Sequence, residues 1–209
     1  MRLTLVDGPA VEPLTAIEAK ARLNIGDEVS DEVMEAYITA ARQRIDGAVG
    51  WLGRALITQT WQGKLDEFPT CDNGRIDVPL PPLQEITEIS YLDADGLPVV
   101  VAEGDYQVVY GPRPFIVPLA SWPSVTGTDG ITIEFIAGYG DEGTDVPEPI
   151  RVAIALGAGR MASMSTRGSS ITEEVVEGVG STRYATPKDT GEVDHVSQSL
   201  LSTYRLHWV

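Results

Sequence analysis

The stretch at residues 51–61, WLGRALITQTW, marks a change in hydrophobic pattern, and this change constrains the fold more than any other feature. Over residues 33–49, before it, apolar residues recur at helical spacing. Over residues 55–140, after it, they fall in short segments rich in β-branched and aromatic side chains. The sequence therefore predicts a helical part that gives way to a β part within a few residues.

The residues at this junction suggest how the change is made. We expect Gly50 or Gly53 to end the preceding helix, because glycine adopts the left-handed conformation at little cost. In this interpretation Gly53 releases the helix, Ile57 and Trp61 begin the sheet, and Trp51 packs at the junction.

Helix signals lie on both sides of the β part. Thr15 and Glu18 have the spacing of a capping box, and Ser30 is a natural N-cap for the second helix. Asp145 is the expected N-cap of a helix near residues 146–164, with Pro147 in its first turn.

The middle of the chain reads as strands joined by turns. The strand LQEITEISYL departs from strict alternation, which predicts a bulge, and Asp95-Gly96 is a hairpin signal. Such short strands favour a small antiparallel sandwich or open barrel. Seven segments carry the pattern: ALITQTWQGKL, GRIDVPL, LQEITEISYLD, LPVVVAE, DYQVVYG, RPFIVPL and GITIEFIAGYG.

The predicted class is α+β, with an antiparallel β-sandwich or barrel-like domain inserted into a helical core. That core consists of two N-terminal helices, the helix near residues 146–164 and a C-terminal helix. The expected divisions are an N-terminal helical part at 1–54, an inserted β domain at 55–143, a helix completing the helical part at 144–165, an extended arm at 166–195 and a C-terminal docking segment at 196–209.

Two apolar stripes are candidates for contacts between helices. The third helix presents small and apolar residues that allow a partner helix to approach closely, namely Ile154, Gly157, Ala158 and Met161. The terminal segment follows a polar arm and either packs on its own domain or docks on another subunit. Its apolar residues are Val196, Leu200, Leu201, Tyr204 and Trp208.

Charge is the strongest compositional signal. The net charge is −16 and the isoelectric point is about 4.4. Residues 55–150 alone carry 16 acids and 3 bases. This balance disfavours an ordinary nucleic-acid binder, which needs basic residues to neutralise phosphates. It fits either a solubility-favouring surface or a part that works beside DNA, or among many copies of itself, without sticking.

The sequence gives little support for catalysis. His195 and His207 lie late in the chain without metal-ligand spacing, and Cys71 sits in a turn-rich segment with no nearby histidine. No catalytic, cofactor-binding or metal-binding residue is predicted. Two other readings stay open: a hydrolase using paired carboxylates, and a carbohydrate- or receptor-binding β module with aromatic platforms around Trp61, Trp122 and Tyr106.

The expected cellular location follows from the lack of a membrane-spanning segment and of a signal peptide in the sequence. A mean hydropathy of −0.03 and no apolar run of about 18 residues argue against a membrane-spanning helix. The N-terminus lacks the apolar stretch of a signal peptide, and a lone cysteine suits a reducing cytosol.

Several strings, in this order, resemble the head–tail connector (adaptor) family of tailed phages, which includes relatives in gene transfer agents. They are PAVEPLTAIEAKARL, GRALITQTWQGKLDEFP, LPPLQEITEISYLDADG, DYQVVYGPRPFIVPLASWP, ITIEFIAGYGDEGTDVPEPIRVAI and the terminal LLSTYRL. Residues 165–195 depart from the family pattern, being longer and more polar.

The resemblance implies a structural virion protein rather than an enzyme, made in the bacterial cytoplasm and assembled in the particle neck. It implies a ring, typically of twelve copies, that binds the portal and a stopper or tail, extends the DNA channel and lets DNA pass without specific binding. A stopper or tail-completion factor is the alternative within the same class. On this view Ile154, Gly157, Ala158 and Met161 pack the ring. Leu200, Leu201, Tyr204, Arg205 and Trp208 dock on the portal or a neighbour.

Overall fold

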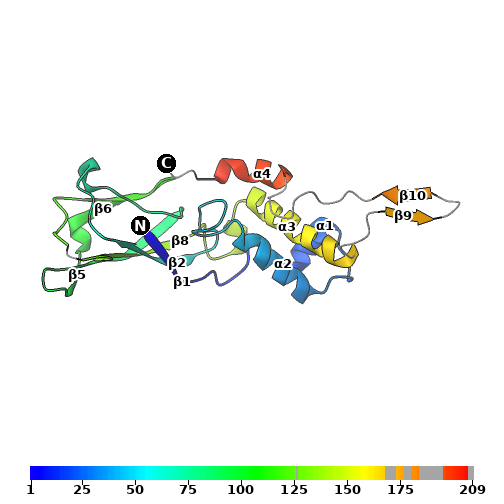
Figure 1. Cartoon of the computed structure of the whole chain (residues 1–209), viewed down its shortest axis with the longest axis horizontal. Coiled ribbons are helices and arrows are strands. Elements are labelled where there is room, and N and C mark those ends of the chain that lie inside the picture. Colours follow the sequence, from blue (N-terminus) through cyan, green and yellow to red (C-terminus); the bar gives the residue numbers. More distant parts are fainter. Residues whose placement is uncertain (126, 168–172, 177–179, 184–194, 207–209) are drawn as a thin grey trace. The chain divides into compact units, whose positions relative to one another are not determined.

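The computed structural model describes residues 1–125, 127–167, 173–176, 180–183 and 195–206. The chain forms two compact units. The first, here called the β unit, comprises Met1–Pro13, Gln43–Val146 and Arg205–Val209. The second, the helical unit, comprises Leu14–Arg42 and Pro147–Tyr204. The predicted α+β class is confirmed (Figure 1).

A five-stranded antiparallel sheet is the larger part of the β unit. Its strands follow the order β1-β2-β8-β4-β5, so β1 and β5 are its edges (Figure 1). Because the sheet has two open edges among the described residues, it is not a closed barrel. The strands are β1 (Arg2–Asp7), β2 (Gln59–Leu65), β4 (Leu83–Leu92), β5 (Pro98–Val100) and β8 (Ile131–Ala137).

A second, three-stranded sheet has the order β3-β7-β6. Both sheets bury side chains in one apolar cluster that includes Trp61 and Phe135 from the larger sheet and Ile116 from the smaller. The arrangement is sandwich-like, and each of the seven predicted strands is found in its segment. The smaller sheet contains β3 (Ile76–Asp77), β6 (Tyr106–Val109) and β7 (Phe115–Pro118).

Strand β4 contains the predicted irregularity. Its register against β8 shifts twice, between Leu83 and Glu85 and again between Ile86 and Glu88. Each shift inserts an extra residue, so that Leu83, Ile86 and Ile89 all face the core although they are three apart. The predicted Asp95-Gly96 turn joins β4 to β5, and Asp93 Oδ1 accepts hydrogen bonds from the backbone N–H groups of Asp95 and Leu97, both at 2.9 Å.

Strand β1 was not expected, since residues 1–54 read as a helical part. It pairs with β2 from Arg2 opposite Lys64 to Asp7 opposite Thr60. Arg2 secures it by ion pairs with Asp66, at 2.7 Å, and with Asp129. The strand gains its hydrogen bonds only from a partner distant in sequence, so no local pattern announces it.

The end of helix α2 (Asp31–Gln43) corrects a second prediction. Ser30 caps its start, because its Oγ accepts a hydrogen bond from the backbone N–H of Val33 at 3.4 Å. The helix stops at Gln43, well before Gly50 and Gly53, so Gly53 does not release it. Gly53 instead has a φ of +65° inside the loop that follows. A Cβ on Gly50 would lie 2.3 Å from the backbone oxygen of Asp46, so the loop is closed too tightly there for any larger residue.

A buried carboxylate explains why the helix stops. Asp46 is only 7% exposed. Its Oδ1 accepts hydrogen bonds from the backbone N–H of Leu56 (2.9 Å) and from Nε2 of Gln59 (3.0 Å), and its Oδ2 also accepts from that Nε2 (2.8 Å). Gln59 Oε1 in turn accepts from Nε1 of Trp61 at 3.1 Å. Bonds to a charged group outweigh the few helical bonds that continuation to residue 50 would add.

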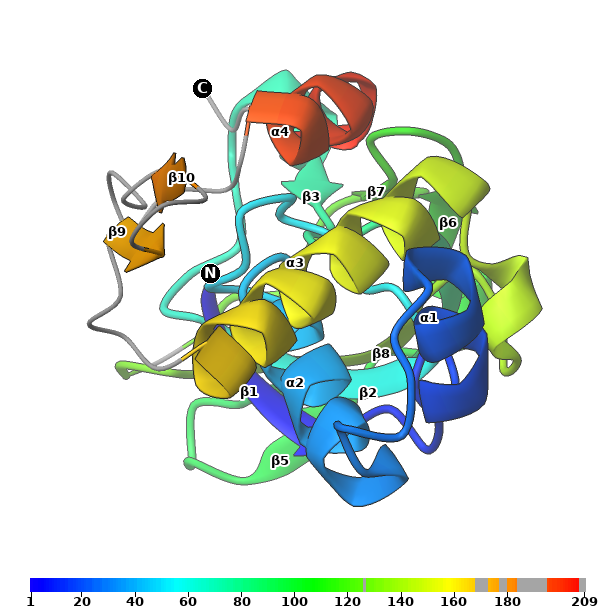
Figure 2. The same cartoon turned by 90° about the vertical axis from the view of Figure 1, so that its right-hand side faces the viewer.

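The helical unit places two helices beside a long one (Figure 2). Helix α1 (Ala16–Leu23) is capped as predicted, because Thr15 Oγ1 accepts from the N–H of Glu18 at 3.2 Å. Helix α3 (Glu148–Arg167) starts after Pro147, whose carbonyl accepts from the N–H of Ile150 at 2.9 Å. Asp145 is therefore not its N-cap. Its carboxylate accepts from the N–H of Glu142 (3.0 Å) and closes a separate turn.

We expect Asp46→Ala to lower the free energy of unfolding by about 2–4 kcal/mol, because it leaves the Leu56 N–H and the Gln59 amide buried without their acceptor. The measurement is urea unfolding followed by Trp fluorescence. Asp95→Ala, at an exposed turn, is the matched control and should change stability by less than about 0.5 kcal/mol. Equal effects of the two variants would contradict the role given to Asp46.

Candidate assembly surfaces

The terminal segment packs on its own unit. Helix α4 (His195–Leu201) contacts α3 within the helical unit. Leu201 is fully buried, Leu200 and Tyr204 are half-buried, and Val196 is 57% exposed. Of the two readings of this segment, packing on its own domain holds for Leu201. Trp208 lies outside the described residues.

The chain then returns to the β unit at the predicted junction. The guanidinium of Arg205 lies over the ring of Trp51, with its Cζ 4.3 Å from the ring centroid. One residue later, the backbone N–H of Leu206 donates to the carbonyl of Leu52 at 3.0 Å. Trp51 is half-buried, and Leu52 and Ile57 are fully buried or nearly so. The sequence predicts separate sites for Trp51 and Arg205, whereas the structure brings the two residues together.

Part of the expected arm at 166–195 is described. Strands β9 (Glu173–Val176) and β10 (Gly180–Arg183) pair antiparallel, with Gly180 opposite Val176 and Arg183 opposite Glu173. The remaining residues of the arm, 168–172, 177–179 and 184–194, lie outside the described residues. A pair of antiparallel strands thus occupies part of the segment that the sequence predicts as an extended arm.

The small residues of α3 pack inside the helical unit. Ile154 is 1% exposed and Ala158 is fully buried, while Gly157 and Met161 are half-buried. A Cβ on Gly157 would lie 3.2 Å from the Cβ of Ala41 in α2. The close approach expected between copies is therefore made, for these residues, between helices of one chain.

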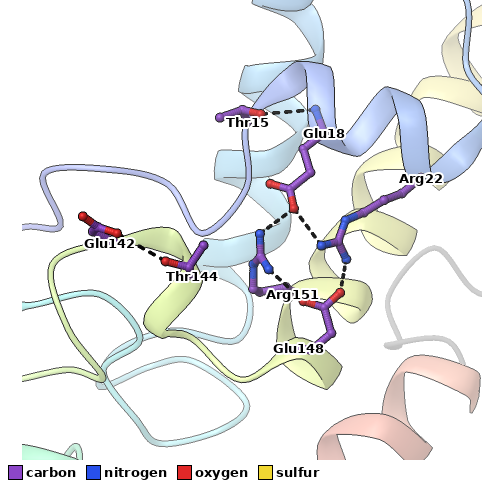
Figure 3. A network of polar contacts seen from close by, with 7 residues as sticks. All are labelled: Thr15, Glu18, Arg22, Glu142, Thr144, Glu148 and Arg151. Atoms are coloured by element: carbon purple, nitrogen blue, oxygen red, sulfur yellow. Dashed lines mark hydrogen bonds and ion pairs between the residues drawn. The ribbon is translucent and has the colours of Figure 1, made fainter.

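A charged network that sequence reasoning missed connects α1 to α3 (Figure 3). Glu18 Oε1 accepts from Arg22 (2.7 Å) and from Arg151 (2.5 Å). Glu148 accepts from Arg151 (2.7 Å) and from Arg22. The four groups alternate in sign and carry no net charge, and the Arg151 side chain is only 10% exposed. The spacing of Glu18 to Arg22, and of Glu148 to Arg151, was a visible signal.

The network changes the acidity of its members. The hydrogen bond from Arg22 is the main reason that the pKa of Glu148 lies below its ordinary value of 4.5, against an opposing effect of burial. The same bond raises the pKa of Arg22. A carboxyl with a lowered folded-state pKa adds stability above its unfolded-state pKa, and that stability is lost as pH falls through the folded-state value.

The aromatic residues proposed as carbohydrate platforms are used by the core. Trp61 is 6% exposed and Tyr106 is 9% exposed. Trp122 stacks on Phe68, with ring centroids 4.6 Å apart, and its Nε1 donates to the carbonyl of Gly74 at 2.5 Å. Trp61 and Tyr106 are too buried to offer a ring face to a sugar, and Trp122 has one face against Phe68, which weakens the support for that alternative.

One open groove of about 560 Å³ lies on the smaller sheet, lined by Asn73, Arg75, Asp77, Phe115 and Val117. Arg75 lies 3.9 Å over the Phe115 ring and pairs with Asp77 at 2.5 Å. Within the described residues, no group of three or more His, Cys, Asp or Glu side chains is placed to hold a metal ion. Nor does any helix there have the length and apolar character to cross a membrane.

No protein-family model matches the chain, and no curated protein matches it. Solved structures do. A chain from "Virion of native gene transfer agent (GTA) particle" superposes with a TM-score of 0.72 at 22% identity, covering 100% of this chain and 97% of that chain. Chains from "Neck of empty GTA particle computed with C6 symmetry" and "Neck of native GTA particle computed with C12 symmetry" give 0.69 and 0.66, with the same identity and coverage. At this identity the likeness establishes the fold.

We expect Arg151→Met to cost about 1–3 kcal/mol of unfolding free energy, because Glu18 and Glu148 both lose a charged donor at a largely buried position. Chemical denaturation followed by far-UV circular dichroism measures this. Arg160→Met removes a half-buried arginine from the same helix without touching the network, and should cost less than half as much. Equal costs would show that the network contributes nothing specific.

Glu148→Gln tests the pH dependence. At neutral pH the variant should be less stable than wild type, because the amide cannot accept a charge-assisted bond from Arg22. The difference should shrink as pH falls below the ordinary Glu value of 4.5 and Glu148 itself becomes protonated. Denaturation midpoints of both proteins over a pH series provide the measurement. A stability gap that stays constant through the acid range would refute this assignment.

Proposed function

We propose that this protein is a structural component of the neck of a tailed phage or gene transfer agent particle, namely the head–tail connector (adaptor). It would form a ring below the portal, extend the DNA channel and join the capsid to the tail. One observation carries the proposal: the fold matches chains of a gene transfer agent virion and neck over the full length of this chain and 97% of theirs. Similarity over both units, rather than over one common module, supports a shared role.

The charge of the chain suits a passage for DNA. The β unit carries 18 acids and 7 bases, and the helical unit 13 acids and 8 bases, giving net charges of −11 and −5 that add up to the −16 of the whole chain. A wall of this sign repels phosphates, so that duplex slides rather than binds. The work proposed here is mechanical, and we assign no catalytic step, cofactor or metal.

A ring of twelve copies is part of the proposal, since one of the similar neck structures was computed with C12 symmetry. Ile154, Gly157 and Ala158 would serve that ring indirectly. Because they pack α3 inside its own unit, they would stabilise the fold of each subunit within the ring.

The C-terminal segment is the proposed contact with the portal. Leu201 would hold α4 on α3, since it is fully buried. Leu200 and Tyr204 remain half-exposed and, with Trp208, would reach a groove on the portal. Large apolar and aromatic side chains dominate the energies of such contacts. The protein would be made in the bacterial cytoplasm and would join the particle there.

Deleting the gene in a particle-producing host should leave DNA-filled heads without tails, because nothing would connect the portal to the tail. Negative-stain electron microscopy of the particles is the measurement. Complementation with wild type should restore tails. Tailed, infectious or transducing particles from the deletion strain would contradict the proposed role in the neck.

Co-purification from the complemented strain, with a tagged copy of the chain, distinguishes the adaptor role from the stopper role. For an adaptor, the portal co-purifies with the tagged chain, and Tyr204→Asp weakens that capture. Val196→Asp, at a 57% exposed position of the same terminal segment, is the matched control and should capture the portal normally. Capture of another neck protein but not of the portal would favour the stopper role.

A further inference from the structure

Strand β1 leaves one long edge of the larger sheet open. It pairs with β2 on one side, and among the strands that the structure describes none pairs with its other side. Its residues are exposed apart from Leu3, which packs against the apolar cluster. Along the edge of an antiparallel sheet, every second residue directs its backbone N–H and C=O groups outward. Those groups are free to bind another strand.

The other edges of the two sheets are shorter than β1. Strand β5, at the opposite edge of the larger sheet, has three residues and begins with Pro98, which has no N–H to offer. In the smaller sheet, the edge strands β3 and β6 have two and four residues. Strand β1 has six, and the four from Leu3 to Val6 carry no charge. Its register shifts only near its end, between Leu5 and Asp7. A long, uncharged edge is a template for pairing with a further strand.

Strands β9 and β10 lack what β1 could supply. They pair with each other and form a sheet of two strands. Such a sheet is marginally stable by itself in water and needs a further strand or a packed face. In the described part of a single chain, neither strand pairs with β1. The chain therefore has an open edge and a strand pair that fits it, and does not join the two within one copy.

Charge decides which of the two strands suits the edge. The β unit carries a net charge of −11. Strand β9 contains Glu173 and Glu174, so it would bring two more carboxylates to an acidic surface. Strand β10, with the sequence GSTR, contains Arg183 and no acid. Opposite charges on neighbouring strands stabilise their pairing, whereas like charges oppose it.

We propose that β10 of one copy pairs with the open edge of β1 in a second copy. The β9–β10 pair would extend the larger sheet of its neighbour, and hydrogen bonds between main chains would supply the affinity, as in other cases of strand addition. Because the two joined surfaces differ, the contact is head-to-tail, and it closes into a ring when the rotation between copies permits. This inference rests on the proposed function and names the surfaces that join neighbours in its ring.

The test is disulfide cross-linking between purified full-length chains in which the exposed Cys71 is replaced by serine. One protein carries Thr4→Cys in β1 and the other carries Thr182→Cys in β10. After mixing and mild oxidation, a non-reducing gel should show dimers that contain one chain of each kind. Their yield should exceed that of the control mixture, Val100→Cys with Thr182→Cys, by about tenfold or more, because pairing raises the local thiol concentration. Val100 is 59% exposed on β5, the opposite edge.

A chain that carries both Thr4→Cys and Thr182→Cys should form a ladder of dimers, trimers and larger species, as a head-to-tail contact requires. Circular dichroism checks that each variant is folded. A cross-link within one monomer would show that β10 pairs with its own β1 and would overturn the proposal. Dimers of Thr4→Cys alone, formed as efficiently as in the mixture, would identify a second β1 edge as the occupant instead.

A yield no higher than that of the Val100→Cys control would also overturn the proposed contact. The neck role is tested separately by tail attachment. Tailless heads from the deletion strain, together with failed cross-linking between β1 and β10, would reject this contact and leave the neck role standing.

Discussion

The buried Asp46 carboxylate is the interaction on which the arrangement at the centre of the chain depends. It lies just beyond the end of α2 and accepts hydrogen bonds from the backbone N–H of Leu56 and from the side-chain amide of Gln59. Gln59 in turn accepts a hydrogen bond from the indole N–H of Trp61 in β2. The loop that it closes carries Trp51 and Leu52, the two residues to which the chain returns near its C-terminus. A charge buried with several donors stabilises one geometry and penalises others. The Asp46 side chain thus connects the loop that follows α2 with Leu56 and with the first residue of β2, Gln59.

The two units are stabilised by different means. The β unit has a large apolar cluster to which both sheets contribute, so its stability comes mainly from burial. The helical unit adds to its apolar contacts the alternating network of Glu18, Arg22, Glu148 and Arg151. Such a network fixes the relative position of α1 and α3 without adding net charge. Under the proposed function, this would keep the subunit in shape while a densely charged polymer passes.

Local sequence patterns predicted the elements that are stabilised by contacts between residues close together in the sequence. The seven middle strands and the caps at Thr15 and Ser30 all follow from turn chemistry and spacing. Strand β1 could not be found this way, because its stabilisation comes from pairing with β2 far along the chain. Apolar Ile45 and Val49 continued the helical spacing past Gln43, yet Ile45 is buried and Val49 is 98% exposed. The competing bonds of Asp46 are tertiary, as are the contacts of Arg205 with Trp51 and of Arg151 with Glu18, and no pattern in a single sequence specifies them.

The central claim is that this chain forms the ring between head and tail. Cryo-electron microscopy of particles from the producing host, reconstructed around the head–tail junction, tests it most directly. A ring of density at that junction, into which both units of this chain fit, is the predicted result. Density for this chain found only on the capsid surface or at the distal end of the tail would contradict the account.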